Sequence, residues 1–167
     1  RALGADHAGR LLSLVAGSGR LVFDLIRREG IACDADQAGW LQPGHDTASE
    51  AVLRARLPAL RAAGVDVEML DRDEMRRQTG LPQLHGGLVV TSGGQINPLA
   101  YARGLAGAAI RAGAELHSDS TATRIDAEGG GWRIETPGGV LRADRVILAT
   151  NAMIPRSLAP ELAASMI

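Results

Sequence analysis

Apolar residues recur every three or four positions in the first part of the chain, and this spacing predicts a helix over residues 6–29. Gly30 follows, which is typical of a helix that ends in a left-handed cap. The stripe expected to face the core consists of Leu11, Leu14, Val15, Ser18, Leu21, Val22 and Leu25. The chain therefore opens with one long amphipathic helix.

Shorter apolar runs follow this helix and predict a mixture of strands and helices. A strand is expected around Trp40, and Pro43 ends it. Thr47, with Glu50 three residues later, is typical of a capping box at the start of a second helix, which Gly64 ends.

The same alternation continues to the middle of the chain. A strand is expected over residues 65–70 and a short helix over 71–80. Residues 86–90 and 95–96 are expected to pair as a hairpin around the glycine-containing turn 91–94.

A further helix is expected to begin after Asn97, because asparagine is a good cap. Pro98 fits the first helical position, where a backbone N–H would have no partner within the helix. Gly113 ends it. The stripe expected to be buried consists of Leu99, Ala102, Leu105, Ala106, Ala109 and Ile110. Its alanines are small enough for the helix to lie close to a sheet.

The last third of the chain is rich in strand-forming segments. Strands are expected at residues 114–117, 121–127, 132–136 and 139–142, the last two as a hairpin. Residues 145–150 show no polar alternation, which is typical of a strand buried on both faces of a parallel sheet. Ligands of open α/β sheets bind beyond the carboxyl ends of such strands, so the small residues that end this segment mark a candidate site. A buried strand with a polar turn accounts for the same pattern.

Composition excludes several classes of function. Basic residues number 18 and acidic residues 19, and aromatic residues make up 2%, so we expect no nucleic-acid partner. Cys33 is the only cysteine, which excludes an internal disulfide and favours a reducing cytoplasm. No apolar run approaches the ~18 residues of a membrane span.

Motifs for metal binding or nucleophilic catalysis are absent from the sequence. The histidines, at His7, His45, His85 and His117, lack the spacing of a metal site, so no metal is expected. Gly17-Ser18-Gly19 follows no strand and is not a phosphate loop. The residues alone predict an α/β chain without a named reaction, and the catalytic residues stay unknown.

Several segments, in order, resemble the glycine/D-amino-acid oxidase (DAO) family of flavoenzymes, and most closely its γ-glutamylputrescine oxidoreductase branch. These segments are residues 26–34, 69–71, 85–88, 93–98, 113–114, 121–125 and 146–152. The resemblance implies an FAD-dependent oxidoreductase that oxidises the C–N bond of an amine or amino acid by hydride transfer to flavin. The family's N-terminal G-x-G-x-x-G loop and C-terminal flavin segment do not occur in this sequence, so we expect an interior piece of a longer enzyme.

The resemblance also implies a layout. Residues 1–30 and 97–152 would belong to a partial FAD-binding, Rossmann-like domain, with a β-meander over 121–143. Residues 31–96 would form part of an antiparallel-sheet substrate domain, and 153–167 would begin the return to it.

The cofactor-binding residues follow from the same resemblance. Ala122 stands where the family usually has a valine whose backbone meets the adenine ring, and Ala149, Thr150 and Asn151 resemble the turn near the adenosine and pyrophosphate. Two other hypotheses stay open: a flavin dehydrogenase of 2-hydroxy acids or glycerol phosphate, and a non-catalytic binding or assembly module. We expect the isolated chain to be colourless, to bind FAD poorly and to self-associate through open sheet edges.

Overall fold

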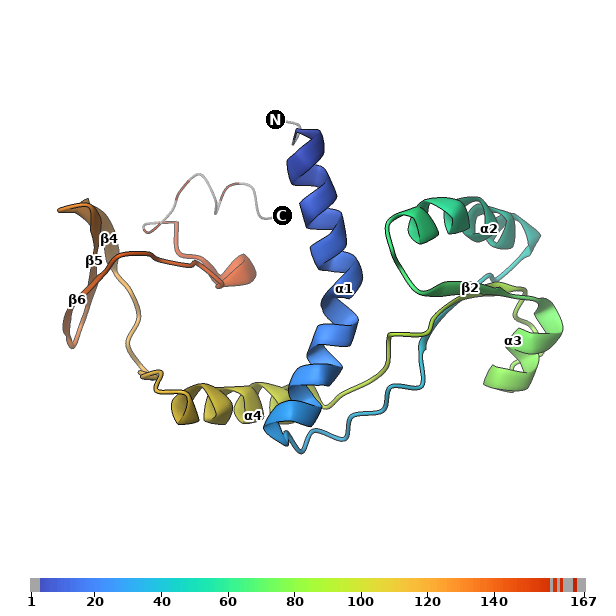
Figure 1. Cartoon of the computed structure of the whole chain (residues 1–167), viewed down its shortest axis with the longest axis horizontal. Helices are drawn as coiled ribbons and strands as arrows, with labels where there is room; N and C mark the ends of the chain where they lie inside the picture. The colour runs from blue at the N-terminus through green and yellow to red at the C-terminus, as the bar shows by residue number, and fades with distance from the viewer. Residues whose placement is uncertain (1–3, 157, 159, 161–163, 165–167) are drawn as a thin grey trace. The chain divides into compact units, whose positions relative to one another are not determined.

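The computed structural model describes residues 4–156, 158, 160 and 164, and the chain divides into two compact units, residues 1–114 and 115–167. Figure 1 shows the helices and strands in chain order. Among the helices described, none combines the length and the apolar composition that crossing a membrane requires.

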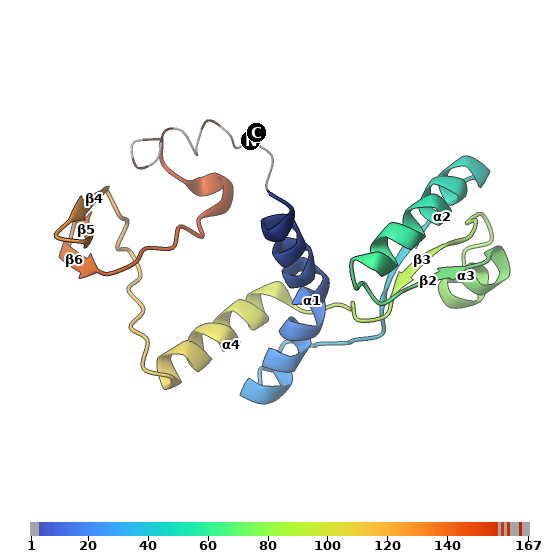
Figure 2. The same ribbon diagram turned by 45° about the horizontal axis from the view of Figure 1, so that its top comes forward.

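The predicted first helix is confirmed as α1, Ala5–Glu29, with Gly30 in the left-handed conformation at its end. Its second half carries the buried residues Phe23 and Ile26, which form a core cluster with Ile31 and Cys33. Its predicted apolar stripe is wrong for the first half, where Leu14, for example, is 71% exposed. Helix α4 crosses α1 near the C-terminal end of α1, so it covers none of the first half (Figure 1 and Figure 2).

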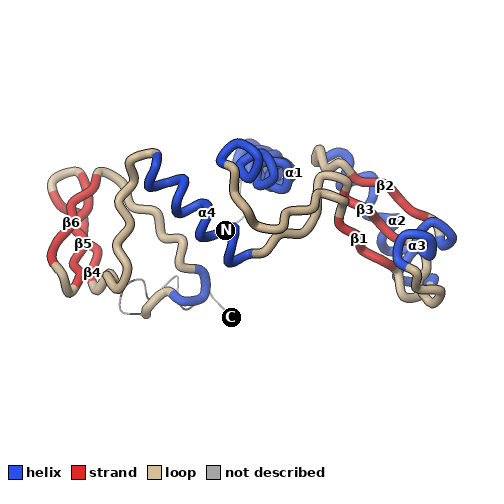
Figure 3. Tube along the Cα trace, turned by 90° about the horizontal axis from the view of Figure 1, so that it is seen from below, coloured by secondary structure: helices blue, strands red, loops and turns tan. Residues whose placement is uncertain are grey.

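The first sheet has three antiparallel strands in the order β1 (Trp40–Pro43), β3 (Gly87–Val90) and β2 (Val67–Leu70), as Figure 3 shows from below. Helix α2, Thr47–Ala62, covers one face. Helix α3, Arg72–Thr79, supplies the buried Met75 to a second core cluster. Successive residues of β3 point to opposite faces of the sheet, so Val89 joins this second cluster and Leu88 joins a third. The all-apolar strand β3 is therefore buried at the centre of the sheet.

The predicted hairpin between residues 86–90 and 95–96 is wrong. Strand β3 pairs with β1 and β2 instead, and Gln95 forms only an isolated bridge to Asp36. Glycine in this turn lets its backbone lie close to neighbouring backbone: a Cβ on Gly94 would stand 2.2 Å from the carbonyl oxygen of Asp36. The turn therefore packs against the segment that leads into β1 and does not fold back on β3.

Helix α4, Pro98–Arg111, is confirmed with Asn97 as its cap; the Asn97 side chain accepts the N–H of Ala100 at 3.1 Å. Its predicted buried stripe is wrong, since Leu99, Leu105 and Ile110 are exposed. The helix instead turns Gly104 towards Ile31 and buries Ala108.

The second unit contains an antiparallel meander of β4 (Arg124–Glu128), β5 (Gly131–Thr136) and β6 (Gly139–Ala143), which confirms the predicted meander and hairpin. A short 3₁₀ helix follows at Asn151–Met153. Part of the segment 153–167, which was expected to begin the return to the substrate domain, lies outside the described residues.

Two predicted strands, residues 114–117 and 145–150, are wrong: neither forms a ladder, and Ile147 is 89% exposed. A strand buried on both faces needs a hydrogen-bonded neighbour on each side. The described residues provide no neighbouring strand for either segment, so their apolar character does not bring them into a core.

Candidate functional site

Ala122, the residue expected to meet the adenine ring, lies half-buried just before β4. Its neighbour Thr123 is fixed by Glu135, whose carbonyl oxygen accepts the Thr123 N–H at 2.8 Å and its hydroxyl at 3.2 Å. Within the described part of the chain, no hydrogen bond is made by the backbone of Ala122. The N–H and C=O groups of Ala122 are therefore compatible with hydrogen bonds to a base.

The turn at residues 149–151 is exposed and small. Asn151 adopts a left-handed conformation with φ 49°, which asparagine tolerates better than most residues, and the N–H of Met153 donates to the carbonyl of Thr150 at 3.1 Å. Such a turn leaves backbone groups exposed to solvent. No hydrogen bond joins them to Ala122 among the residues that the structure covers.

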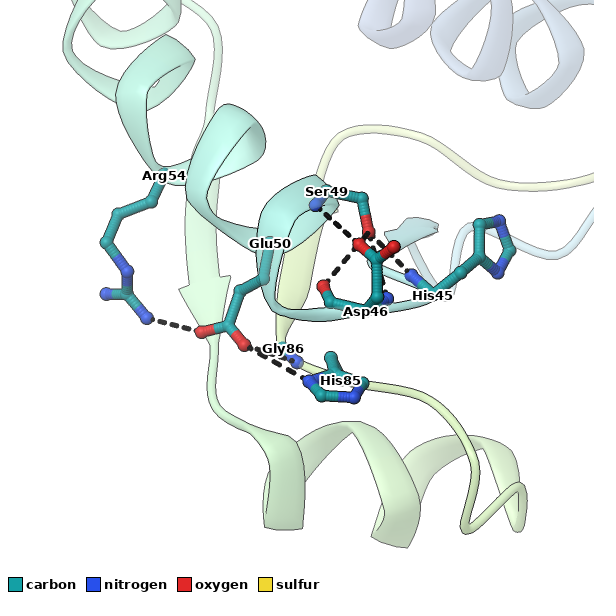
Figure 4. Close-up of polar contacts among 7 residues, drawn as sticks. All are labelled: His45, Asp46, Ser49, Glu50, Arg54, His85 and Gly86. Carbon is teal, nitrogen blue, oxygen red and sulfur yellow. Dashed lines mark hydrogen bonds and ion pairs between the residues drawn. The ribbon is translucent and has the colours of Figure 1, made fainter.

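Ionisable side chains gather at the start of α2, as Figure 4 shows. The helix is capped by Asp46 and not by the predicted Thr47: the Asp46 carboxylate accepts the N–H of Ser49 at 2.7 Å, and the Ser49 hydroxyl accepts the N–H of Asp46 at 3.0 Å. The signal was in the sequence, because aspartate ranks above threonine as a cap. The Ser49 backbone N–H, first, and its hydroxyl lower the pKa of Asp46.

Glu50, predicted to complete the capping box, instead connects α2 to the start of β3. Its carboxylate accepts hydrogen bonds from Arg54 at 2.8 Å and from the N–H of Gly86 at 3.3 Å, and Nδ1 of His85 lies 3.9 Å away (Figure 4). The hydrogen bond from Arg54 is the main cause of a lowered pKa for Glu50, with smaller contributions from Gly86 and His85. Gly86 must be glycine here, since a Cβ would stand 2.7 Å from the carbonyl oxygen of Leu70.

This polar cluster stabilises the fold and does not resemble a catalytic centre. Both carboxylates are engaged in hydrogen bonds to backbone N–H groups, so neither is free to act as a general base. In the described portion of the chain, no three histidine, cysteine or acidic side chains are placed to hold a metal ion.

Comparison with known proteins assigns the chain to a family. The family model described as "FAD dependent oxidoreductase" (DAO) matches residues 2–167. The chain belongs to the DAO family. The resemblance inferred from the ordered segments is therefore confirmed, and FAD is the cofactor of this family.

Curated DAO relatives are similar over nearly the whole chain. The probable oxidoreductase OrdL of Rhizobium meliloti (strain 1021) is 31% identical over 91% of the chain. D-amino acid dehydrogenase of Cereibacter sphaeroides (strain ATCC 17029 / ATH 2.4.9) is 30% identical over 93%, and gamma-glutamylputrescine oxidoreductase of Escherichia coli (strain K12) is 29% identical over 98%. The matched regions make up 36%, 37% and 38% of these relatives, so the chain spans little more than a third of their length.

Solved structures share the fold. Glycine oxidase from Geobacillus kaustophilus superposes with a TM-score of 0.70 and 23% identity, covering 97% of this chain and 44% of that one. L-proline dehydrogenase from P. horikoshii gives 0.72 and 17%, covering 91% and 40%. The predicted mixed fold, with helices, antiparallel sheets and the Rossmann-like architecture of DAO flavoenzymes, is thereby confirmed.

Proposed function

We propose that this chain is the central part of an FAD-dependent oxidoreductase that oxidises the C–N bond of a small amine or amino acid. Membership of the DAO family over residues 2–167 carries the proposal. Its curated relatives include a D-amino acid dehydrogenase and a gamma-glutamylputrescine oxidoreductase, whose names point to amino-acid and amine substrates. The flavin supplies the hydride chemistry when it is bound, and the protein binds and orients it.

We propose that the chain contributes to two domains, with the layout expected from the family. Residues 1–30 and 97–152 belong to the FAD domain in this proposal, residues 31–96 to the substrate domain, and 153–167 begin the return. Two observations support it: the sheet β1-β3-β2 with α2 and α3 is contained within residues 31–96, and the meander is contained within 97–152.

The residues proposed to hold the adenosine end of FAD are Ala122, Ala149, Thr150 and Asn151. Their small side chains and accessible backbone groups support this assignment.

The test uses the full-length protein that contains this chain. The purified protein should carry flavin, and D- and L-amino acids or primary amines should bleach the visible absorption of the oxidised flavin under anaerobic conditions. Reduction by 2-hydroxy acids or glycerol phosphate, and not by amines or amino acids, would replace the proposed substrate class by another. A full-length protein without flavin would favour the binding-module hypothesis.

We also propose a cytoplasmic location, supported by the single buried Cys33, since cysteines that form no disulfide are typical of reducing compartments. For the isolated 167-residue chain, we propose weak FAD binding and self-association through its exposed apolar segments.

A further inference from the structure

A groove lies within the first unit, between α1 and the end of the sheet. It encloses about 540 Å³, within the range of roughly 300–1,000 Å³ that small-molecule sites occupy. Val15, Val22 and Phe23 line it from α1, Trp40 lines it from β1, and the turn at Gly93 lies along it.

Polar side-chain contacts connect α1 to the segments that line the other side of this groove. Arg20 of α1 forms an ion pair with Asp66, just before β2, at 2.5 Å. Gln37 joins the helix to the turn, since its Oε1 accepts from Arg27 at 2.9 Å and its Nε2 donates to the Ser92 carbonyl at 3.2 Å. These contacts hold α1 beside Asp66 and Ser92, whose segments line the opposite side of the groove.

The lining is uncharged. Its hydroxyl side chains are Ser18 and Ser92, and the Ser18 hydroxyl already donates to the Val15 carbonyl at 2.7 Å. Trp40 is 52% exposed and lines the groove. A buried ammonium or carboxylate would meet no side chain of opposite charge in this lining, whereas an aliphatic or aromatic group would be favourably buried.

We propose that this groove receives the hydrocarbon part of the substrate, whose charged groups stay outside it. The inference rests on the proposed function: the groove joins α1, assigned above to the FAD domain, to the sheet assigned to the substrate domain. Ligand sites form preferentially at such junctions, and cofactor and substrate must meet between their two domains. The substrate class is then an amine or amino acid with a sizeable apolar side chain.

The experiment fills the groove in the full-length, flavin-loaded enzyme. Val15→Trp places a large side chain in the groove, and Leu12→Trp, exposed on the same helix but outside the lining, is the matched control. KM is measured for a series of primary amines and amino acids of increasing hydrocarbon length. Val15→Trp should raise KM about tenfold for the longest members, the value of roughly two buried methylenes, and leave it unchanged for the shortest.

Equal KM values for Val15→Trp and Leu12→Trp across the whole series, in an enzyme that oxidises amines, would overturn the groove assignment alone. Calorimetric titration with hexylamine separates this outcome from failure of the proposed function. Binding to the wild type and to Leu12→Trp but not to Val15→Trp supports the groove even without turnover, and absence of binding to the wild type overturns it. Ala16→Phe is a second groove-filling variant if Val15→Trp does not fold.

Discussion

Glu50 serves two elements with one carboxylate, because it lies on the first turn of α2 and accepts a backbone N–H at the start of β3. Each hydrogen bond to a charged group contributes more than one between neutral groups. The Glu50 carboxylate lies so close to Gly86 that a Cβ at position 86 would clash with it. The contact therefore fixes where α2 meets the sheet.

Replacing Glu50 by alanine should lower the free energy of unfolding by about 1–2 kcal/mol, because the Gly86 N–H and Arg54 lose their acceptor. Urea unfolding followed by circular dichroism measures the effect. Glu68→Ala, at an exposed position of β2, is the control and should change stability by less than about 0.5 kcal/mol. An equal effect for both variants would contradict the role given to Glu50.

The lowered pKa values of Asp46 and Glu50 give the stability a defined dependence on pH. A carboxyl whose pKa is lower in the folded state stabilises the fold above its unfolded pKa, about 3.9 for aspartate and 4.3 for glutamate. That contribution is lost as the pH falls through the folded pKa. Stability should therefore drop below about pH 4, and the drop should be smaller in Glu50→Gln than in the wild type. Thermal unfolding at a series of pH values tests this, and parallel curves for the two proteins would refute it.

At the scale of elements, local signals predicted the helices and long-range pairing decided the strands. Asn97 caps the start of α4, and Gly30 and Gly80 cap the ends of α1 and α3. Each cap acts on the adjoining helical turn, so the sequence locates it. Strand β3 pairs with two strands that both end more than fifteen residues before it in the chain, and no local pattern distinguishes these partners from the nearby residues 95–96.

The periodicity of apolar residues also did not predict which face of α4 is buried. The stripe predicted for α4 contains its largest apolar side chains, but the structure buries the face that carries Gly104. That face can approach Ile31 closely because glycine has no side chain. The candidate flavin residues came from family resemblance and not from residue chemistry, since alanine and threonine carry no catalytic signature. The structure leaves their role as a proposal.

Gly104→Ala should test the packing of α4. Alanine favours a helix by about 1 kcal/mol, but its Cβ would stand 2.3 Å from Cγ2 of Ile31, so we expect a net loss of about 1–3 kcal/mol of stability. Gly107→Ala on the same helix meets only the end of Arg111 at 3.7 Å and should be neutral or stabilising. Chemical unfolding of both variants measures the difference, and a stabilised Gly104→Ala would show that α4 does not pack as described.

At the scale of the whole molecule, the segment 145–150 presents apolar side chains to solvent, above all Ile147. Exposed apolar segments with unpaired backbone groups favour association between copies. Ile147→Asp should therefore reduce the self-association proposed for the isolated chain, as measured by light scattering over a range of concentrations. Thr121→Asp, an exposed position in the same unit, adds the same charge and is the control. A wild-type chain that stays monomeric at high concentration would refute the proposal.

The two tryptophans are divided between the two compact units: Trp40 lies in residues 1–114 and Trp132 in residues 115–167. Replacing either one by phenylalanine leaves a single indole whose emission reports on one unit alone. Intrinsic fluorescence can thus follow the unfolding of each unit separately in the same chain, without an added dye.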